Sequence, residues 1–309
     1  MSHGFKFATV AIALCATLSP SVVSADNTAI VYAVDDFSDY RANKCGDARD
    51  VDATSTEDLP DSVSMANKVY AVLSDWKSDS DWDGVHEYTN GNVAKVSFLD
   101  VNRFAKGADG VRAGGLDLFD VAFISTHGTS ITAGGKYYSM LGMGSTTNGC
   151  FARTYDMLFG NAGSNSVTGD LDVLITYACE SVQRDVFVAD GYDVMNGSGD
   201  AFRLFLGFHG SSWNGHGGDV EDYFEGSRTS GIGSHWLSEL YAWGYTSSTS
   251  DSADREQCPT ALVWGDSTSS ISDFYKHSGL GARSETGSKT IKSLHYLSGC
   301  DPKNGSPLP

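Results

Sequence analysis

Two segments of the chain each end an apolar run at a residue that can take part in acid, base or nucleophilic chemistry. Residues 119–127 end in His127, and residues 171–179 end in Cys179. Both runs are rich in β-branched and aromatic side chains, which is typical of buried strands. Functional groups in open α/β sheets lie just beyond the carboxyl ends of the strands. If the two strands are neighbours, an imidazole and a thiol lie at one edge of the sheet.

A thiol next to an imidazole predicts nucleophilic catalysis, because the histidine can take up the proton of the cysteine and stabilise the thiolate. Gly128 would let a substrate approach closely, and the amides of Gly128 and Cys179 are candidate donors to an oxyanion. Glu180 lies beside them as a candidate substrate-binding residue. The alternative interpretation is that His127 is a hydrogen-bonded loop residue and Cys179 a small buried hydrophobic residue.

A second histidine leaves the identity of the base open. The apolar run 203–208 also ends in a His-Gly pair, His209 and Gly210, which should lie at the same edge of the sheet. This pair could form a wall of the site, bind substrate, or replace His127 as the base.

The elements that must position these residues follow from the hydrophobic pattern. Apolar residues recur at three- and four-residue steps over 62–76, which predicts a helix. Further helices are expected near 151–159 and, in two pieces broken at 230–233, over 219–245, and the tail from Gly279 is expected to be a surface loop. Six strands are expected, at 29–34, 93–98, 119–128, 171–179, 203–208 and 260–265. Short strands separated by helical connections predict one α/β domain with a mainly parallel sheet.

The motifs at the two strand ends resemble those of a known enzyme clan. Ser-Thr-His-Gly at 125–128 and Tyr-Ala-Cys-Glu-Ser at 177–181 are similar to the His-Gly and Ala-Cys motifs of the caspase/legumain/gingipain clan of cysteine peptidases. The second motif is especially similar in sequence to that of legumain. The chain also resembles an uncharacterised bacterial family of this fold. The resemblance implies a caspase-like three-layer sandwich with a six-stranded sheet flanked by helices. It also implies that Cys179 is the nucleophile and His127 the acid/base of an acyl-transfer reaction.

The first 25 residues predict export. A weakly basic start, an apolar run over 7–18 and the small residues Val23-Ser24-Ala25 are typical of a secretory signal peptide. The apolar run is too short for a spanning helix, and no later stretch is long enough. We therefore expect a secreted or periplasmic protein, with residues 26–309 forming one domain and a Gly/Ser-rich insertion at about 129–170.

The cysteines of the mature chain are odd in number. Without the signal peptide the chain keeps Cys45, Cys150, Cys179, Cys258 and Cys300. Two disulfides in an oxidising compartment leave one thiol, and Cys179 is the natural candidate because it alone ends a strand-like run. We expect the pairs 45–150 and 258–300, although the sequence allows three connectivities.

The charge balance restricts the partners. The net charge of −18 disfavours nucleic acid, whose phosphates would be repelled. A protein or peptide substrate is expected, no cofactor is required, and the oligomeric state is left open.

One acidic segment matches the start of a calcium-binding loop. Asp79, Asp81 and Asp83 alternate and are followed by Gly84, while Glu87 takes the ninth position. Asn90 stands where the standard loop has a bidentate Glu. The segment predicts either a structural Ca²⁺ site or a solvated acidic loop.

The leading prediction is therefore an exported cysteine-type endopeptidase that uses Cys179 and His127. The alternative is a catalytically silent caspase-like scaffold that binds a protein or glycan partner.

Overall fold

The computed structural model describes residues 27–42, 44–45, 56–77, 82–160, 171–193, 195, 201–213, 216–245, 255–281 and 289–309. The expected signal peptide lies outside these ranges. No helix within them is both long and apolar enough to cross a membrane.

A mixed eight-stranded sheet forms the centre of the fold, in the order β11-β10-β8-β7-β3-β1-β2, with β9 pairing to β10. The strands are β1 Asn27–Ala33, β2 Trp82–Thr89, β3 Val121–Ser125, β7 Val173–Tyr177, β8 Leu204–His209, β9 Ala242–Tyr245, β10 Arg255–Gly265 and β11 Ile291–Tyr296. The five strands β2, β1, β3, β7 and β8 are parallel, and β10 runs antiparallel to β8, β9 and β11.

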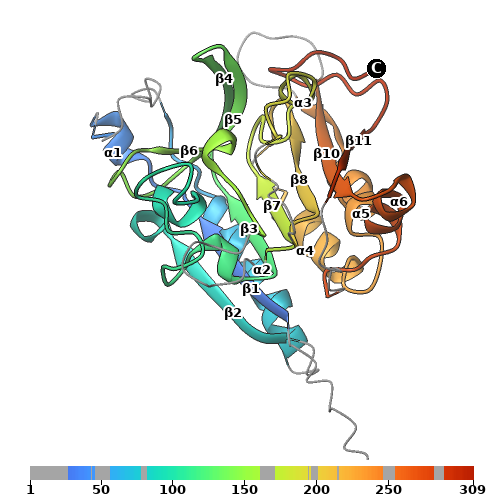
Figure 1. Ribbon diagram of the computed structural model, residues 1–309, viewed down its shortest axis with the longest axis horizontal. Coiled ribbons are helices and arrows are strands. Elements are labelled where there is room, and N and C mark those ends of the chain that lie inside the picture. Colours follow the sequence, from blue (N-terminus) through green and yellow to red (C-terminus); the bar gives the residue numbers. More distant parts are fainter. Residues whose placement is uncertain are drawn as a thin grey trace, which may run out of the picture.

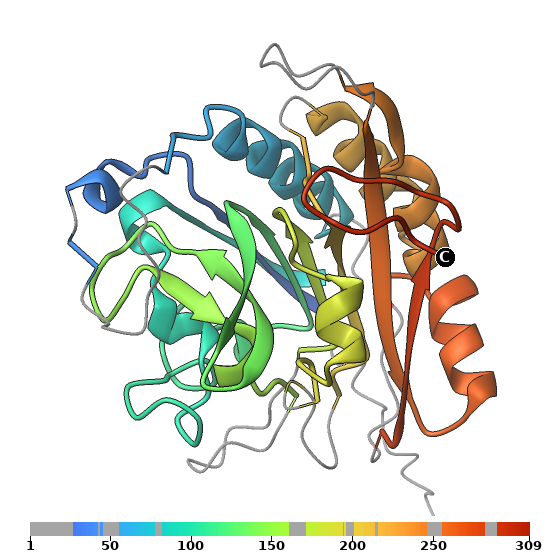
Figure 2. The same ribbon diagram turned by 90° about the horizontal axis from the view of Figure 1, so that it is seen from above.

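Each face of the sheet buries its own hydrophobic core. In β1, Ile30 and Tyr32 belong to one core, while Ala29, Val31 and Ala33 belong to the other, as expected from the two-residue period of a strand. Helices cover the second face (Figures 1 and 2). They are α2 Ser62–Trp76, α4 Gly217–Gly226, α5 Ile232–Glu239 and α6 Thr268–Lys276.

A smaller antiparallel sheet and short helices pack on the first face (Figure 2). The small sheet consists of β4 Gly128–Ala133, β5 Lys136–Gly142 and β6 Phe151–Arg153. It is built from the segment predicted as a Gly/Ser-rich insertion, of which 161–170 lie outside the described ranges. The short helices are α1 Ser38–Arg41 and α3 Arg184–Val188.

Several predicted elements are confirmed. The helix over 62–76 is present as α2. The helical region expected from 219 is interrupted, as predicted, but at 227–231, between α4 and α5, so that residues 232 and 233 of the predicted break begin α5. Both expected disulfides are formed, Cys45–Cys150 and Cys258–Cys300, and Cys179 is the free thiol among the described cysteines.

Other predicted elements are wrong, and the segments that form unexpected strands do so by pairing with another strand. Residues 95–98 form a 3₁₀ turn instead of a strand. The parallel strand at the edge of the sheet, next to β1, is β2, which comes from the segment expected to be an acidic loop. β2 is an edge strand, so its exposed side carries polar residues and hides the strand pattern.

Three further corrections concern the ends of other segments. The segment expected to be a helix near 151–159 begins as β6, paired with β5, and continues as a 3₁₀ turn over Thr154–Asp156. Residues 242–245 form β9 instead of extending a helix. The tail expected to be a loop contains β11, which pairs with β10. The sheet therefore has eight strands instead of the expected six.

A buried ion pair joins the amino ends of two central strands. Nη2 of Arg203 lies 2.9 Å from Oδ2 of Asp172, and the two side chains are 6% and 9% exposed. Because the pair is desolvated, removal of one partner leaves an uncompensated charge in the interior.

We expect Arg203→Met to lower the free energy of unfolding by about 3 kcal/mol or more, because Asp172 stays buried. Urea unfolding followed by circular dichroism measures this. The matched control is Lys68→Met, which breaks a half-exposed pair with Glu221 and should cost less than about 1 kcal/mol. Equal losses in the two variants would contradict the expected role of burial.

Candidate functional site

The register of two strands brings His127 and Cys179 to one cavity. β3 and β7 are parallel neighbours paired from Val121 with Val173 to Ser125 with Tyr177. His127 and Cys179 each lie two residues beyond the last pair, Ser125 with Tyr177. The two residues are therefore at the same level beyond the edge of the sheet. A cavity of about 290 Å³ lies at this edge and is lined by both residues, by the segments 57–59, 125–126 and 211–213, and by Ser62, Tyr177 and Lys303.

The thiol of Cys179 is half-buried and contacts Ser212. The backbone N–H of Ser212 donates to Sγ at 3.4 Å, and Sγ lies 3.6 Å from both the carbonyl oxygen and the hydroxyl of Ser212. Burial raises the pKa of the thiol, and the contacts with Ser212 partly oppose that effect. The resting group is therefore a neutral thiol at neutral pH.

His127 is oriented by a backbone carbonyl. Its Nε2 lies 2.7 Å from the oxygen of Glu57, and its ring packs on Phe37 with centroids 4.7 Å apart. A carbonyl can only accept, so Nε2 carries the hydrogen and Nδ1 keeps the lone pair. Burial lowers the pKa of His127, an effect that the Glu57 carbonyl partly opposes. The imidazole is therefore neutral at neutral pH and can accept a proton at Nδ1.

Gly128 packs directly against the turn that carries Cys179. A Cβ at this position would lie 2.0 Å from the carbonyl oxygen of Cys179, so only glycine fits. Gly128 pairs with Leu141 of β5, and the hydrogen bond from Gly142 N–H to the His127 oxygen, at 2.8 Å, closes the ladder one residue away. In the antiparallel pattern this leaves Gly128 in a non-hydrogen-bonded pair, so its N–H points away from β5.

The structure places the second predicted histidine outside the cavity lining. His209, at the end of β8, is fully buried. Its Nδ1 accepts from the N–H of Arg184 at 3.2 Å, and its Nε2 lies 2.7 Å from the oxygen of Ser306. Both ring nitrogens are thus engaged by the backbone, whereas the residues just after Gly210 do line the cavity.

The C-terminal segment 301–306 holds the loop that covers the thiol. The N–H of Ser211 donates to the Lys303 oxygen at 2.8 Å, and Asn304 Nδ2 lies 3.1 Å from the Ser211 hydroxyl. Gly210 adopts a φ of 76° under Pro302 and Lys303, where a Cβ would clash. This C-terminal segment therefore positions the Ser211–Ser212 turn against Cys179.

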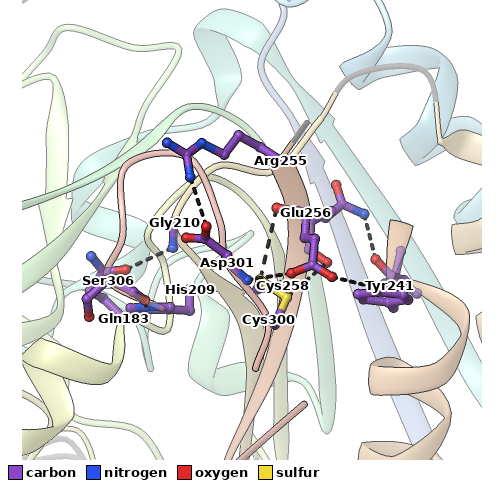
Figure 3. The surroundings of a disulfide bond; sticks show 12 residues. Gln183, His209, Gly210, Tyr241, Arg255, Glu256, Cys258, Cys300, Asp301 and Ser306 are labelled. Carbon is purple, nitrogen blue, oxygen red and sulfur yellow. Dashed lines mark hydrogen bonds and ion pairs between the residues drawn. A yellow bond between two sulfur atoms is a disulfide. The ribbon is translucent and has the colours of Figure 1, made fainter. Parts of the chain in front are cut away.

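The disulfide Cys258–Cys300 fixes the start of the C-terminal segment (Figure 3). Beside it, Arg255 forms an ion pair of 2.9 Å with Asp301, and the Asp301 N–H donates to the Glu256 carboxylate. Glu256 and the two cysteines also form the one cluster of metal-ligand types found among the described residues. Because the two sulfurs are bonded to each other, this cluster is a disulfide cross-link and its cysteines are not thiolate ligands for a metal.

The cavity has a neutral, hydroxyl-rich floor and a charged rim. Ser62, at the start of α2, and Ser125, at the end of β3, are buried, and their hydroxyls lie 3.0 Å apart. Glu57, Asp58 and Lys303 lie at the more exposed part of the lining. Asp58 is neutralised by Arg41, whose two terminal nitrogens donate to its carboxylate.

The predicted calcium ligands are only partly described. Asp79 and Asp81 lie outside the described ranges, and Asp83 and Glu87 are exposed on β2. Residues four apart in a strand are separated by about 13 Å, so this strand does not bring Asp83 and Glu87 to one ion. The Ca²⁺ site stays a prediction for the segment before β2.

Sequence reasoning missed the groups that act through the backbone. The Glu57 carbonyl and the amide of Ser212 carry no signature in side-chain type. Lys303 and Ser211 come to the cavity through the disulfide and the tail. The pairing of Cys258 with Cys300 was the available signal for that placement.

Comparison with known proteins does not assign the chain to a family. No model of a known protein family matches it, and no curated protein matches it.

We expect Cys258→Ser/Cys300→Ser to expose the thiol of Cys179. The disulfide closes 42 residues of chain, so its loss should cost about 3 kcal/mol of stability and release the C-terminal segment from the Ser211–Ser212 turn. The measurement is the rate of Cys179 alkylation by iodoacetamide, which should rise in the folded variant.

Cys45→Ser/Cys150→Ser is the matched control, because it removes the disulfide that joins the α1 region to the chain before β6. It should lose stability without a change in the alkylation rate. An equal rate in both double variants would show that the C-terminal segment does not cover the thiol.

Proposed function

We propose that the protein is an exported cysteine peptidase that cleaves peptide bonds through Cys179 and His127. The observation that carries this proposal is that the two residues leave adjacent parallel strands level with each other and line one cavity. Two disulfides fit an oxidising compartment outside the cytoplasm. The parallel centre of the sheet, flanked by layers on both faces, supports a caspase-like arrangement.

Nδ1 of His127 is the proposed base. It takes the proton of the Cys179 thiol as the sulfur attacks the carbonyl carbon of the substrate. The protonated imidazole then gives this proton to the leaving amine, and the C–N bond breaks to leave a thioester. A water molecule, deprotonated by His127, attacks the thioester, releases the acid and restores the thiol.

The amides of Gly128 and Cys179 are the proposed oxyanion donors. Gly128 N–H lies in a non-hydrogen-bonded position of the β4–β5 ladder, and its backbone contacts that of Cys179. Two rigid donors at this point would stabilise the negative charge of the tetrahedral intermediate.

Cys179→Ala and His127→Ala should each abolish hydrolysis of a mixed peptide library and leave the thermal unfolding midpoint nearly unchanged. For the native protein, activity should persist below pH of about 6.5, the ordinary histidine value, because burial lowers the pKa of His127. Activity should then disappear as acid protonates Nδ1. The control is His277→Ala, at an exposed position. Hydrolysis that survives both site substitutions would overturn the proposal.

A second candidate function is a catalytically silent scaffold that binds a protein or glycan partner. It is favoured by the raised pKa of Cys179, since an activated thiol usually has a lowered one. In addition, Ser212, and not His127, supplies the hydrogen-bond partners of the thiol within the described residues.

Peptide hydrolysis, measured together with alkylation of the native protein across pH, separates the two functions. The raised pKa predicts slow alkylation of Cys179 that increases only above pH of about 8.5, where a free cysteine titrates. A peptidase should combine this slow alkylation with measurable hydrolysis that Cys179→Ala removes. A scaffold should show the same alkylation profile and no hydrolysis.

A further inference from the structure

Glu180, the residue after the thiol, lies in an unusual backbone conformation. Its φ is +52°, in the left-handed region that side chains other than glycine, asparagine and aspartate rarely adopt. This conformation costs free energy, so it persists only where surrounding contacts impose it. All three polar groups of Glu180 have such contacts.

The side chain of Glu180 binds the hairpin formed by β4 and β5. Its Oε2 accepts from the backbone N–H of Ser130 at 2.9 Å and also from the Ser130 hydroxyl. The hydroxyl of Tyr137, on the opposite strand, lies 2.9 Å from the same Ser130 oxygen. The carboxylate therefore binds β4 directly and β5 through the Ser130 hydroxyl.

The backbone of Glu180 makes two more connections. Its carbonyl accepts from the Ser139 hydroxyl of β5 at 2.6 Å, and its N–H donates to the Gly210 oxygen at 2.7 Å. Glu180 thus joins three segments at the edge of the sheet: the β7 turn, the hairpin and the β8 turn.

The first residue of that hairpin is Gly128, whose N–H is a proposed oxyanion donor. Ser130 lies only two residues further along β4, so the Glu180–Ser130 contact fixes the start of the strand on the Cys179 turn. We propose that Glu180 is a positioning residue that clasps the hairpin to this turn and so holds the Gly128 N–H in place for the reaction. This inference rests on the proposed peptidase function.

The clasp needs an acceptor and does not need a charge. Glutamine offers one carbonyl oxygen at the same reach, which can accept both bonds from Ser130. Asparagine is one methylene shorter and cannot reach Ser130, yet it tolerates the left-handed conformation better than most residues. Glu180→Gln and Glu180→Asn are therefore a matched pair, both neutral amides, that differ in the clasp.

Hydrogen exchange of residues 128–142 tests the clasp without any activity. Glu180→Gln should keep the protection of the hairpin amides, and Glu180→Asn should lose at least about tenfold, as expected for bonds to a lost acceptor. Ser130→Ala, which removes one of the two donors, should give an intermediate loss. Equal protection in the Gln and Asn variants would overturn the clasp.

Kinetics test whether the clasp positions the oxyanion donor. Glu180→Asn should lower kcat by about a hundredfold, the effect of losing one such donor, with little change in KM, and Glu180→Gln should stay near the native kcat. Glu225→Ala, an exposed position on α4, is the control. Equal kcat in the two Glu180 variants would overturn the positioning role.

The charge of Glu180 gives two further readouts. The titratable groups around its carboxylate are Cys179, Tyr137 and Tyr192. Burial is the main cause of the raised pKa of Cys179, and the charge of Glu180 adds to it, so both neutral variants should be alkylated somewhat faster than the native protein at a fixed pH.

Burial also raises the pKa of Glu180, and the protonated acid keeps one carbonyl oxygen that can accept both bonds from Ser130. The hairpin protection should therefore persist when Glu180 becomes protonated, in the native protein as in Glu180→Gln. A loss of protection on protonation of the native protein that Glu180→Gln does not show would contradict a clasp that needs only an acceptor. If the native protein cleaves no peptide, the proposed function fails, whereas the exchange results still decide the clasp.

Discussion

The parallel pairing of β3 with β7 is the constraint on which the site depends. Strands that run in the same direction end at the same edge, and their register sets how far each chain continues beyond it. Here the register brings His127 and Cys179 out level with each other. A shift of one residue would turn every side chain of β3 to the opposite face and would separate the two groups.

The site is built to keep its reactive groups neutral at rest. Burial raises the pKa of the thiol and lowers that of the imidazole, and the Glu57 carbonyl selects the tautomer with a free Nδ1. Formation of an ion pair inside this cavity would have to offset the desolvation of both charges. In the proposed peptidase reaction, proton transfer that accompanies attack on a bound carbonyl would avoid a stable charged pair.

Loops around the cavity are held by contacts to distant parts of the chain. The C-terminal segment, fixed by Cys258–Cys300, positions the turn that touches the thiol, and Glu180 holds the hairpin that begins at Gly128. The disulfide and the hydrogen bonds therefore add, at the cavity, to the order that core packing of the hairpin supplies.

Local patterns in the sequence determined the helix α2, the two strands that end at His127 and Cys179, and the odd cysteine. Each of these features depends on neighbouring residues or on the number of cysteines, so it can be predicted without knowledge of the fold. The tertiary structure decided that β2, β6 and β11 are strands, since a strand gains its hydrogen bonds from a partner far away in the sequence. It also placed His209 against the C-terminal segment and His127 in the cavity. Both histidines come at the end of an apolar strand and precede a glycine. Only the contacts of the folded chain distinguish His127, whose Nδ1 has no partner among the described residues, from His209, whose two ring nitrogens are both engaged.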